Sequence, residues 1–183
     1  MERPFFTIGH SNRSLEDFTR LLGAAEVDRV VDVRKMPGSR ANPQFNRDAL
    51  ALTLPAAGLS YQHIAELGGL RTKTPGLSPG VNDLWTNKSF HRYADYALTQ
   101  PFRAGLDQLL DEGARQRCAV MCSEAVWWRC HRRIIADYLL AHGKTVFHIM
   151  GEGRLEPAKL TPGAVMQSDG TIHYPASHAL DCC

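Results

Sequence analysis

Short apolar runs alternate along this chain with longer segments of helical periodicity, an order that is typical of a parallel β-sheet covered by helices. Three of the runs are apolar or β-branched on both faces, as interior strands of such a sheet are. These interior strands are predicted at Phe5–Gly9, Arg29–Arg34 and Ala119–Cys122, and two further strands at Leu59–Ile64 and Val146–Met150. The sequence therefore predicts an α/β fold with a mainly parallel sheet of about five strands and helices on both faces.

Start and stop signals bound the helices between these strands. Ser14 is a predicted N-cap, with Asp17 three residues later in a weak form of the capping box. Asn46 is the predicted N-cap of a helix that runs to about Ala57, where Gly58 is placed to end it. Further helices are expected at about 90–116, with a break near Pro101, and at about 129–141, with a long surface loop at 68–88.

The length of 183 residues fits a single domain, and the C-terminal extension, from about 152 to 183, is expected to be less regular than the rest. Within it, Ser168-Asp169-Gly170 is predicted to turn a small hairpin between Val165–Gln167 and Thr171–Tyr174. The terminal pair Cys182-Cys183 is expected to take no part in the fold.

Charge and hydropathy narrow the function classes. No run approaches the roughly 20 apolar residues that cross a bilayer, and the N-terminus has no secretory signal, so we expect a cytoplasmic protein without a membrane partner. The net charge of +2 argues against strong nonspecific binding of nucleic acid, although it allows a local basic patch. Five cysteines are an odd number in a chain that can build its own core, so no disulfide framework is expected.

Polar side chains follow the predicted strands at the edge where an open parallel sheet binds its ligands. They come from the ends of the first, second and fourth strands and from the segment that begins the last helix. Because one sheet edge brings these segments together, we expect their side chains to line a common crevice. The residues are His10, Ser11, Asp32, Arg34, Ser39, Arg40, Glu124, Cys130, His131 and Arg132.

Cys130 has two interpretations. If it lies in the first turn of a helix, the helix dipole and nearby arginines lower the pKa of its thiol and favour a nucleophilic thiolate. A free cysteine is also commonly a small, inert core residue. His131 is not expected to act on Cys130 through adjacency alone, because neighbouring side chains of a helix point about 100° apart.

Asp32 interrupts an apolar strand, where an unpaired buried carboxylate would be costly. Arg34 follows on the same strand face about 7 Å away, so a purely structural Asp–Arg pair is one interpretation of both residues. The other is that they belong to a binding site, since three separate strand ends carry polar groups of this kind.

No metal and no cofactor is predicted. Cys118 and Cys122 on one strand would be about 13 Å apart, too far to share a zinc ion. The spacing of Cys118, Cys122, Cys130 and His131 matches no ordinary zinc module, and a His10/Glu124/His131 set has no support from spacing. The chain also lacks a Walker loop and a GxGxxG motif after its first strand, so neither nucleotide fingerprint applies.

The segment from Arg29 to Arg47 carries five basic residues and one acid, Asp32. Together with Arg132 and Arg133 and the free backbone N–H groups of helix starts, it favours binding of a phosphate or a carboxylate. Aromatic side chains could also stack the bases of single-stranded nucleic acid, although tryptophan is more often part of a core. They are Phe45, Trp85, Trp127 and Trp128.

Several motifs together resemble one known family. They are Thr7-Ile8-Gly9-His10-Ser11, Asp32-Val33-Arg34 with Pro37 and Ser39, Asn42-Pro43-Gln44-Phe45-Asn46, Leu67-Gly68-Gly69, and Met121-Cys122-Ser123-Glu124 leading to Cys130-His131-Arg132. In this order, over about residues 7–151, they resemble the family catalogued as domain of unknown function 488. The resemblance implies the α/β fold and joins the same strand-end motifs, and it implies no activity, cofactor or catalytic residue.

Two functions remain open from the sequence. In the first, the protein is an enzyme acting on an anionic, phosphate-bearing substrate such as a nucleotide or nucleic acid, with His10 and Glu124 as acid/base groups, Asp32 as orienter and Cys130 as nucleophile. In the second, it is a non-catalytic module that binds nucleic acid or another anion. Both use the same anion-binding residues: Ser11, Arg34, Ser39, Arg40, His131 and Arg132.

Overall fold

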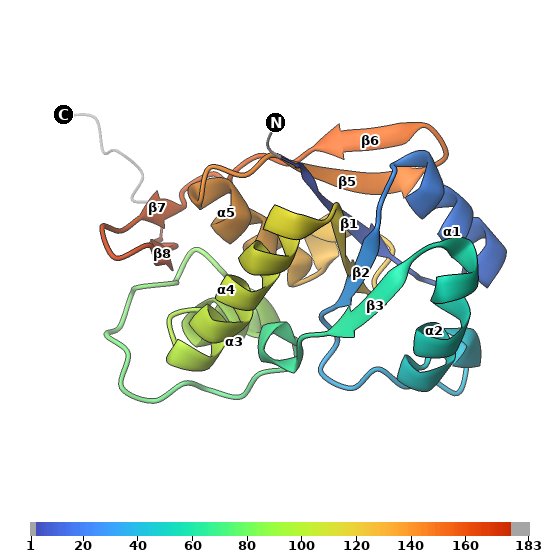
Figure 1. Ribbon diagram of the computed structural model, residues 1–183. Coiled ribbons are helices and arrows are strands. Elements are labelled where there is room, and N and C mark those ends of the chain that lie inside the picture. The colour runs from blue at the N-terminus through green and yellow to red at the C-terminus, as the bar shows by residue number, and fades with distance from the viewer. Residues whose placement is uncertain (1–2, 177–183) are drawn as a thin grey trace.

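The computed structural model describes residues 3–176, and its main sheet has six strands in the order β3-β2-β4-β1-β5-β6 (Figure 1). β1 to β5 pair in parallel, and β6 pairs antiparallel with β5 at one edge. The predicted α/β fold is confirmed, and the three strands predicted as interior are interior. The strands are β1 (Phe5–Gly9), β2 (Arg29–Asp32), β3 (Ser60–His63), β4 (Cys118–Cys122), β5 (Val146–Gly151) and β6 (Arg154–Pro157).

Two details of the sheet differ from the prediction. β2 ends at Asp32 rather than Arg34, because the backbone N–H of Arg34 donates to the Asp32 carboxylate (3.0 Å) instead of continuing the strand ladder. The sequence does not predict β6, whose residues are mostly exposed and include a proline, so no apolar run marks it.

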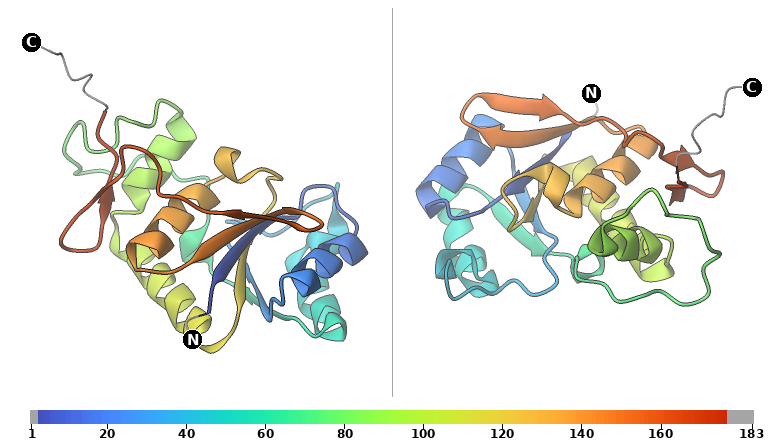
Figure 2. Two further views of the ribbon diagram at one scale, coloured as in Figure 1. Left: turned by 90° about the horizontal axis from the view of Figure 1, so that it is seen from above. Right: turned by 180° about the vertical axis from the view of Figure 1, so that it is seen from behind.

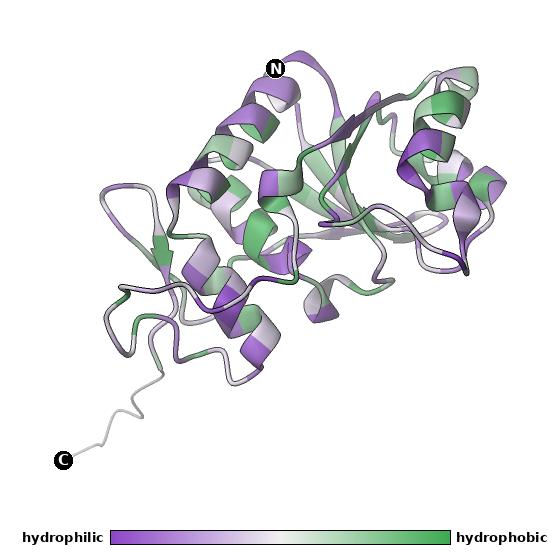
Figure 3. Cartoon of the chain, turned by 90° about the horizontal axis from the view of Figure 1, so that it is seen from below, coloured by the Kyte–Doolittle hydropathy of each residue, from purple (hydrophilic) through white to green (hydrophobic). Residues whose placement is uncertain are grey.

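Helices cover both faces of the sheet, and each layer buries its own core (Figure 1). One face carries α1 (Leu15–Ala24) and α2 (Arg47–Thr53), and the other carries α3 (Lys88–Tyr96), α4 (Gln100–Arg115) and α5 (Arg132–Ala141). Figure 3 shows green, hydrophobic segments in the strands between these layers and purple, hydrophilic ones on the outer sides of the helices. Neighbouring residues of a buried strand therefore serve opposite cores, as Phe5 and Phe6 do.

The helix boundaries follow the predicted caps with two differences. The Oγ of Ser14 accepts the N–H of Asp17 (3.0 Å), as a capping serine does. Asn46 occupies the N-cap of α2, but its side chain accepts the N–H of Ser39 (2.6 Å) and so holds the loop after β2. α5 begins at Arg132 rather than near Arg129, since a 3₁₀ turn and one extended residue precede it.

The C-terminal segment packs against the long loop between β3 and α3. β7 (Val165–Met166) and β8 (Ile172–His173) form the predicted hairpin, visible in both views of Figure 2. The N–H of Tyr174 then donates to Val81 O (3.0 Å), and the N–H of Leu84 donates to Tyr174 O (2.9 Å). Cys182 and Cys183, which are predicted to take no part in the fold, lie outside the described residues.

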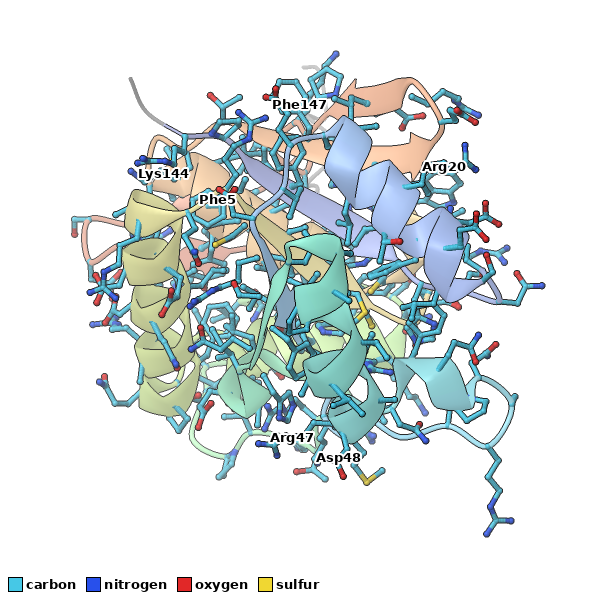
Figure 4. All side chains as sticks on the ribbon, turned by 45° about the vertical axis from the view of Figure 1, so that its right-hand side comes forward. Phe5, Arg20, Arg47, Asp48, Lys144 and Phe147 are labelled. Carbon is cyan, nitrogen blue, oxygen red and sulfur yellow. The ribbon has the colours of Figure 1, made fainter. Side chains whose placement is uncertain are left out.

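Charged side chains gather on the outside of the molecule. Figure 4 shows Arg20 on α1 and Arg47 and Asp48 on α2 projecting outward. Among residues 3–176, no helix combines the length and the hydrophobicity that a membrane span requires.

His148 of β5 gives this fold a defined sensitivity to acid. Burial, followed by the charge of Arg132, lowers its pKa to about 4. The unfolded chain binds a proton on this residue near pH 6.5 and the folded chain does not, so stability falls as pH drops from about 6.5 to 4, at up to about 1.4 kcal/mol per pH unit. We expect His148→Gln to make the melting temperature depend less steeply on pH in this window.

Thermal unfolding from pH 7 to pH 4.5 measures this effect. The matched control is His142→Gln, which removes an exposed histidine and should leave the pH slope of the native protein unchanged. Equal slopes for His148→Gln and the native chain would contradict the assignment.

Candidate functional site

A cavity of about 590 Å³ opens at the carboxyl ends of β1, β2 and β4. Its volume falls within the roughly 300–1,000 Å³ that is usual for small-molecule sites. Seven of the side chains predicted from the sequence line it: His10, Ser11, Arg34, Ser39, Glu124, Cys130 and His131. The strand ends therefore meet at one cavity, at the sheet edge where the sequence predicts a crevice.

The other three predicted residues lie elsewhere. Asp32 is fully buried and bonded to Arg34, and Arg132 is buried behind Cys130. Arg40, in the loop after β2, is exposed and does not line the cavity. Asp32 and Arg132 are therefore expected to act through the lining residues that they bind, Arg34 and Cys130. We expect neither Arg40 nor Arg132 to contact a bound anion directly.

Asp32 and Arg34 form a closed, two-point ion pair. The Nε of Arg34 donates to Asp32 Oδ1 (2.9 Å) and its Nη2 donates to Asp32 Oδ2 (2.6 Å). The hydroxyl of Tyr61 donates to the same carboxylate (2.8 Å), and burial followed by that carboxylate raises the pKa of Tyr61. The structural pairing considered from the sequence is therefore present, and Arg34 reaches the cavity as well.

His10 is held in one tautomer by its two neighbours. Its Nδ1 lies 2.8 Å from Ser11 O, which accepts only, so Nδ1 carries the proton. Its Nε2 then accepts from the Nη1 of Arg34 (3.2 Å), while Phe45 stacks on the ring at 4.3 Å. Burial, and to a lesser degree the charge of Arg34, lowers the pKa of His10, so the imidazole is neutral and orients the guanidinium.

Two sulfur atoms and a second imidazole also line the cavity, in a group of residues that we call the sulfur wall: Cys122, Cys130 and His131. The three potential ligand atoms lie within 4.8 Å of one another. The Nδ1 of His131 is 3.7 Å from Cys130 Sγ and 4.0 Å from Cys122 Sγ. Its Nε2 donates to Val33 O (2.9 Å), which fixes the ring and leaves Nδ1 free of a proton.

The expectation that adjacency alone does not bring His131 to Cys130 is wrong, because the Nδ1 of His131 lies 3.7 Å from Cys130 Sγ. It assumed that both residues lie in a helix, but Cys130 has extended backbone angles (φ −126°, ψ 146°) and precedes α5. The turn at His131 (φ −57°, ψ −16°) follows this extended residue, and with these backbone angles the two side chains are in contact.

The buried side chain and backbone of Arg132 donate hydrogen bonds to Cys130. The Sγ of Cys130 accepts the backbone N–H of Arg132 (3.5 Å) and its Nε–H (3.3 Å), and the Arg132 Nη2 donates to Glu124 O (2.5 Å). Arg132 forms no ion pair with a carboxylate of residues 3–176, and its side chain donates to this sulfur and to Glu124 O there. Burial raises the pKa of Cys130, but the hydrogen bond from Cys122 and the charge of Arg132 outweigh it and lower the pKa to about 6.

Comparison with protein-family models matches residues 14–139 to the family described as Domain of unknown function DUF488, which covers more than half of the chain. The chain belongs to this family. No curated protein and no solved structure matches it. The matched region of this DUF488 protein holds Arg34 and the whole sulfur wall, while His10 and Ser11 lie just before it.

Sequence reasoning missed several lining residues of the DUF488 cavity. Cys122 and Lys35 are each adjacent to a predicted site segment, and Arg129 directly precedes Cys130. Gly69, Leu70 and Phe90 come from the loop predicted at 68–88 and the helix after it, where the signals were the length of the loop and, for Gly69, the Leu67-Gly68-Gly69 motif. The aromatic residues predicted to stack bases are elsewhere: Phe45 and Trp85 are buried, and Trp127 stacks on His148.

Proposed function

We propose that this DUF488 protein is an enzyme that acts on an anionic, phosphate-bearing substrate of the nucleotide or nucleic-acid class, bound in the cavity at the strand ends. The observation that carries the proposal is that two different sets of side chains line one cavity. One set is cationic, and we call it the cationic wall; the other is the sulfur wall.

The cationic wall suits a phosphate group. Among the described residues that line the cavity, Arg34, Lys35 and Arg129 are cationic, and Glu124 is the sole carboxylate. Arg34 is fixed by Asp32 and His10, so its guanidinium is oriented before a ligand arrives. The Nε and Nη2 of Arg34 are bonded to Asp32 and to Phe45 O, so its Nη1 is the part that remains available to a phosphate oxygen, in a hydrogen bond strengthened by the guanidinium charge.

The sulfur wall favours an enzyme over a simple binding module. Anion binding needs no thiols, whereas two thiols and an unprotonated imidazole nitrogen in contact are groups that perform nucleophilic or metal-assisted chemistry. The reaction is assigned to this wall, with Glu124 as the carboxylate available for proton transfer. His10 serves as the orienter of Arg34, because its Nε2 is already occupied.

Arg129→Ala tests the cationic wall. The side chain of this exposed arginine has no buried partner among residues 3–176, so we expect the variant to fold normally and to bind inorganic phosphate or a nucleoside monophosphate about tenfold more weakly. Isothermal titration at low salt measures the affinity. The matched control is Arg47→Ala, which removes an exposed arginine of α2 outside the cavity and should bind like the native protein (Figure 4).

The test of catalysis uses the sulfur wall. A panel of nucleoside monophosphates and short oligonucleotides is incubated with the native protein and with Cys130→Ser, and new products are detected by mass spectrometry. We expect conversion with the native protein and binding without conversion with the variant. Binding without any conversion by the native protein would support the non-catalytic module, and absence of phosphate binding would contradict both.

A further inference from the structure

We propose that Cys122, Cys130 and His131 form a binding site for a thiophilic divalent metal ion, with zinc as the best match to the donors. The role of its open coordination position rests on the proposed function. Metal binding itself does not.

The distances between donors fit one ion. With Zn–S bonds near 2.3 Å and Zn–N bonds near 2.0–2.1 Å, tetrahedral geometry separates a sulfur from a nitrogen ligand by about 3.6 Å and two sulfurs by about 3.8 Å. The Nδ1 of His131 lies 3.7 Å from Cys130 Sγ and 4.0 Å from Cys122 Sγ, and all three atoms lie within 4.8 Å of one another. Side-chain adjustments of a few tenths of an ångström would bring them around one ion.

The imidazole is already in the state that a metal ligand requires. Its Nε2–H donates to Val33 O (2.9 Å), and a carbonyl oxygen accepts only, so the lone pair of Nδ1 faces the sulfurs. A ligating histidine almost always donates its other N–H to a carbonyl or carboxylate in this way. Val33 follows directly after β2, so the sheet itself fixes the ring.

Arg132 supports Cys130 as a thiolate ligand. Two N–H groups of Arg132 donate to the sulfur, and the arginine, 1% exposed, meets no carboxylate of residues 3–176 in an ion pair. Hydrogen bonds donated to a coordinated thiolate stabilise its negative charge and fix its orientation. Two thiolates would neutralise a divalent ion, and the charge of Arg132 would leave the centre attractive to an anion.

Three protein ligands at the wall of a cavity leave one coordination position open. All three residues line the 590 Å³ cavity that also contains Arg34 and Arg129. Zinc sites with three protein ligands and a free position bind water or substrate there, whereas structural sites close with four. The geometry is therefore that of a reactive centre facing an anion site, with Cys₂His ligation.

The experiment measures metal content and metal binding of the full chain under reducing conditions. Elemental analysis of the purified native protein is expected to find close to one zinc per chain, and Co²⁺ titration of the metal-free protein should give the visible absorption of tetrahedral thiolate coordination. Cys122→Ala, Cys130→Ala and His131→Asn should each abolish that absorption or weaken Co²⁺ binding by about 100-fold or more.

Cys118→Ala is the matched control. Cys118 is also buried on β4, but about four residues of strand, roughly 13 Å, separate it from Cys122. This variant, and a chain with Cys182 and Cys183 both replaced by serine, should bind Co²⁺ like the native protein. Zinc should raise the melting temperature of both controls but not of Cys122→Ala.

A folded native chain that carries no zinc and shows no Co²⁺–thiolate absorption would overturn the proposal. Co²⁺ binding by Cys122→Ala as tight as that of Cys118→Ala and the native protein would overturn it as well. Either result would leave the phosphate site standing, because Arg129→Ala tests that site without the metal. Conversely, stoichiometric metal with no phosphate or nucleotide binding would reject the proposed function and retain the metal site.

Discussion

Replacing Arg34 by alanine is expected to lower the free energy of unfolding by about 3–5 kcal/mol, because the change leaves a buried carboxylate without its counter-charge. Asp32 is 0% exposed and receives two hydrogen bonds from the Arg34 side chain. In the variant, the neutral hydroxyl of Tyr61 and the backbone N–H of residue 34 would be its remaining donors. Chemical denaturation at pH 7 measures the loss.

A double variant separates the charge from the packing. Asp32→Asn combined with Arg34→Met removes both charges and keeps much of the volume, so it should recover most of the stability lost in Arg34→Ala. Arg129→Ala, which removes an exposed arginine of the same cavity, should change stability by no more than about 0.5 kcal/mol. A loss below 1 kcal/mol in Arg34→Ala would show that water reaches Asp32, contrary to the burial described here.

The same pair explains why Arg34 is a poor probe of ligand binding. The sequence left two alternatives, a closed ion-pair network or a ligand-binding arginine, and Arg34 combines both: it is bonded to Asp32 and lines the cavity. A loss of anion binding in Arg34→Ala would therefore report unfolding as much as a missing contact. Arg129 carries the binding test because its side chain supports no buried partner.

Local patterns predicted the interior strands well because these strands are encoded by their own apolar residues. Phe5–Gly9 and Ala119–Cys122 are interior strands because both of their faces are apolar. The edge strand Arg154–Pro157 has no such pattern and is defined by its pairing with β5. Its position follows from a tertiary contact that the sequence does not display locally.

The site was predicted in position but less well in detail. The rule that ligands bind beyond the carboxyl ends of parallel strands brought His10, Arg34 and Glu124 together correctly. The contact between Cys122 and His131 depends on where α5 begins, and helix boundaries are the part of a structure that sequence fixes least. A shift of three residues turned Cys130 from a helical residue into an extended one and created the sulfur wall.

Gly9→Ala is expected to destabilise the protein by about 3 kcal/mol, because the backbone that follows β4 lies in direct contact with this glycine. We also expect the variant to bind metal more weakly at the sulfur wall. A Cβ at position 9 would lie 1.8 Å from Glu124 O and 2.6 Å from Glu124 C, both backbone atoms that no side-chain rotation can move away. The bonds from His10 N to Cys122 O (2.9 Å) and from Ser11 N to Ser123 O (2.9 Å) hold the two segments at this distance.

The effect should reach the sulfur wall through one carbonyl group. Glu124 O, the atom that the new methyl group would displace, accepts a hydrogen bond from Arg132 Nη2, and the Nε of Arg132 bonds Cys130 Sγ (3.3 Å). Gly23→Ala is the matched control: Gly23 lies in α1, a Cβ there meets nothing within 4 Å, and the change should be neutral or stabilise the protein by up to about 1 kcal/mol. If Gly9→Ala unfolds with the native midpoint and binds Co²⁺ with native affinity, then Glu124 does not hold Arg132 in place, and the support for Cys130 must come from elsewhere.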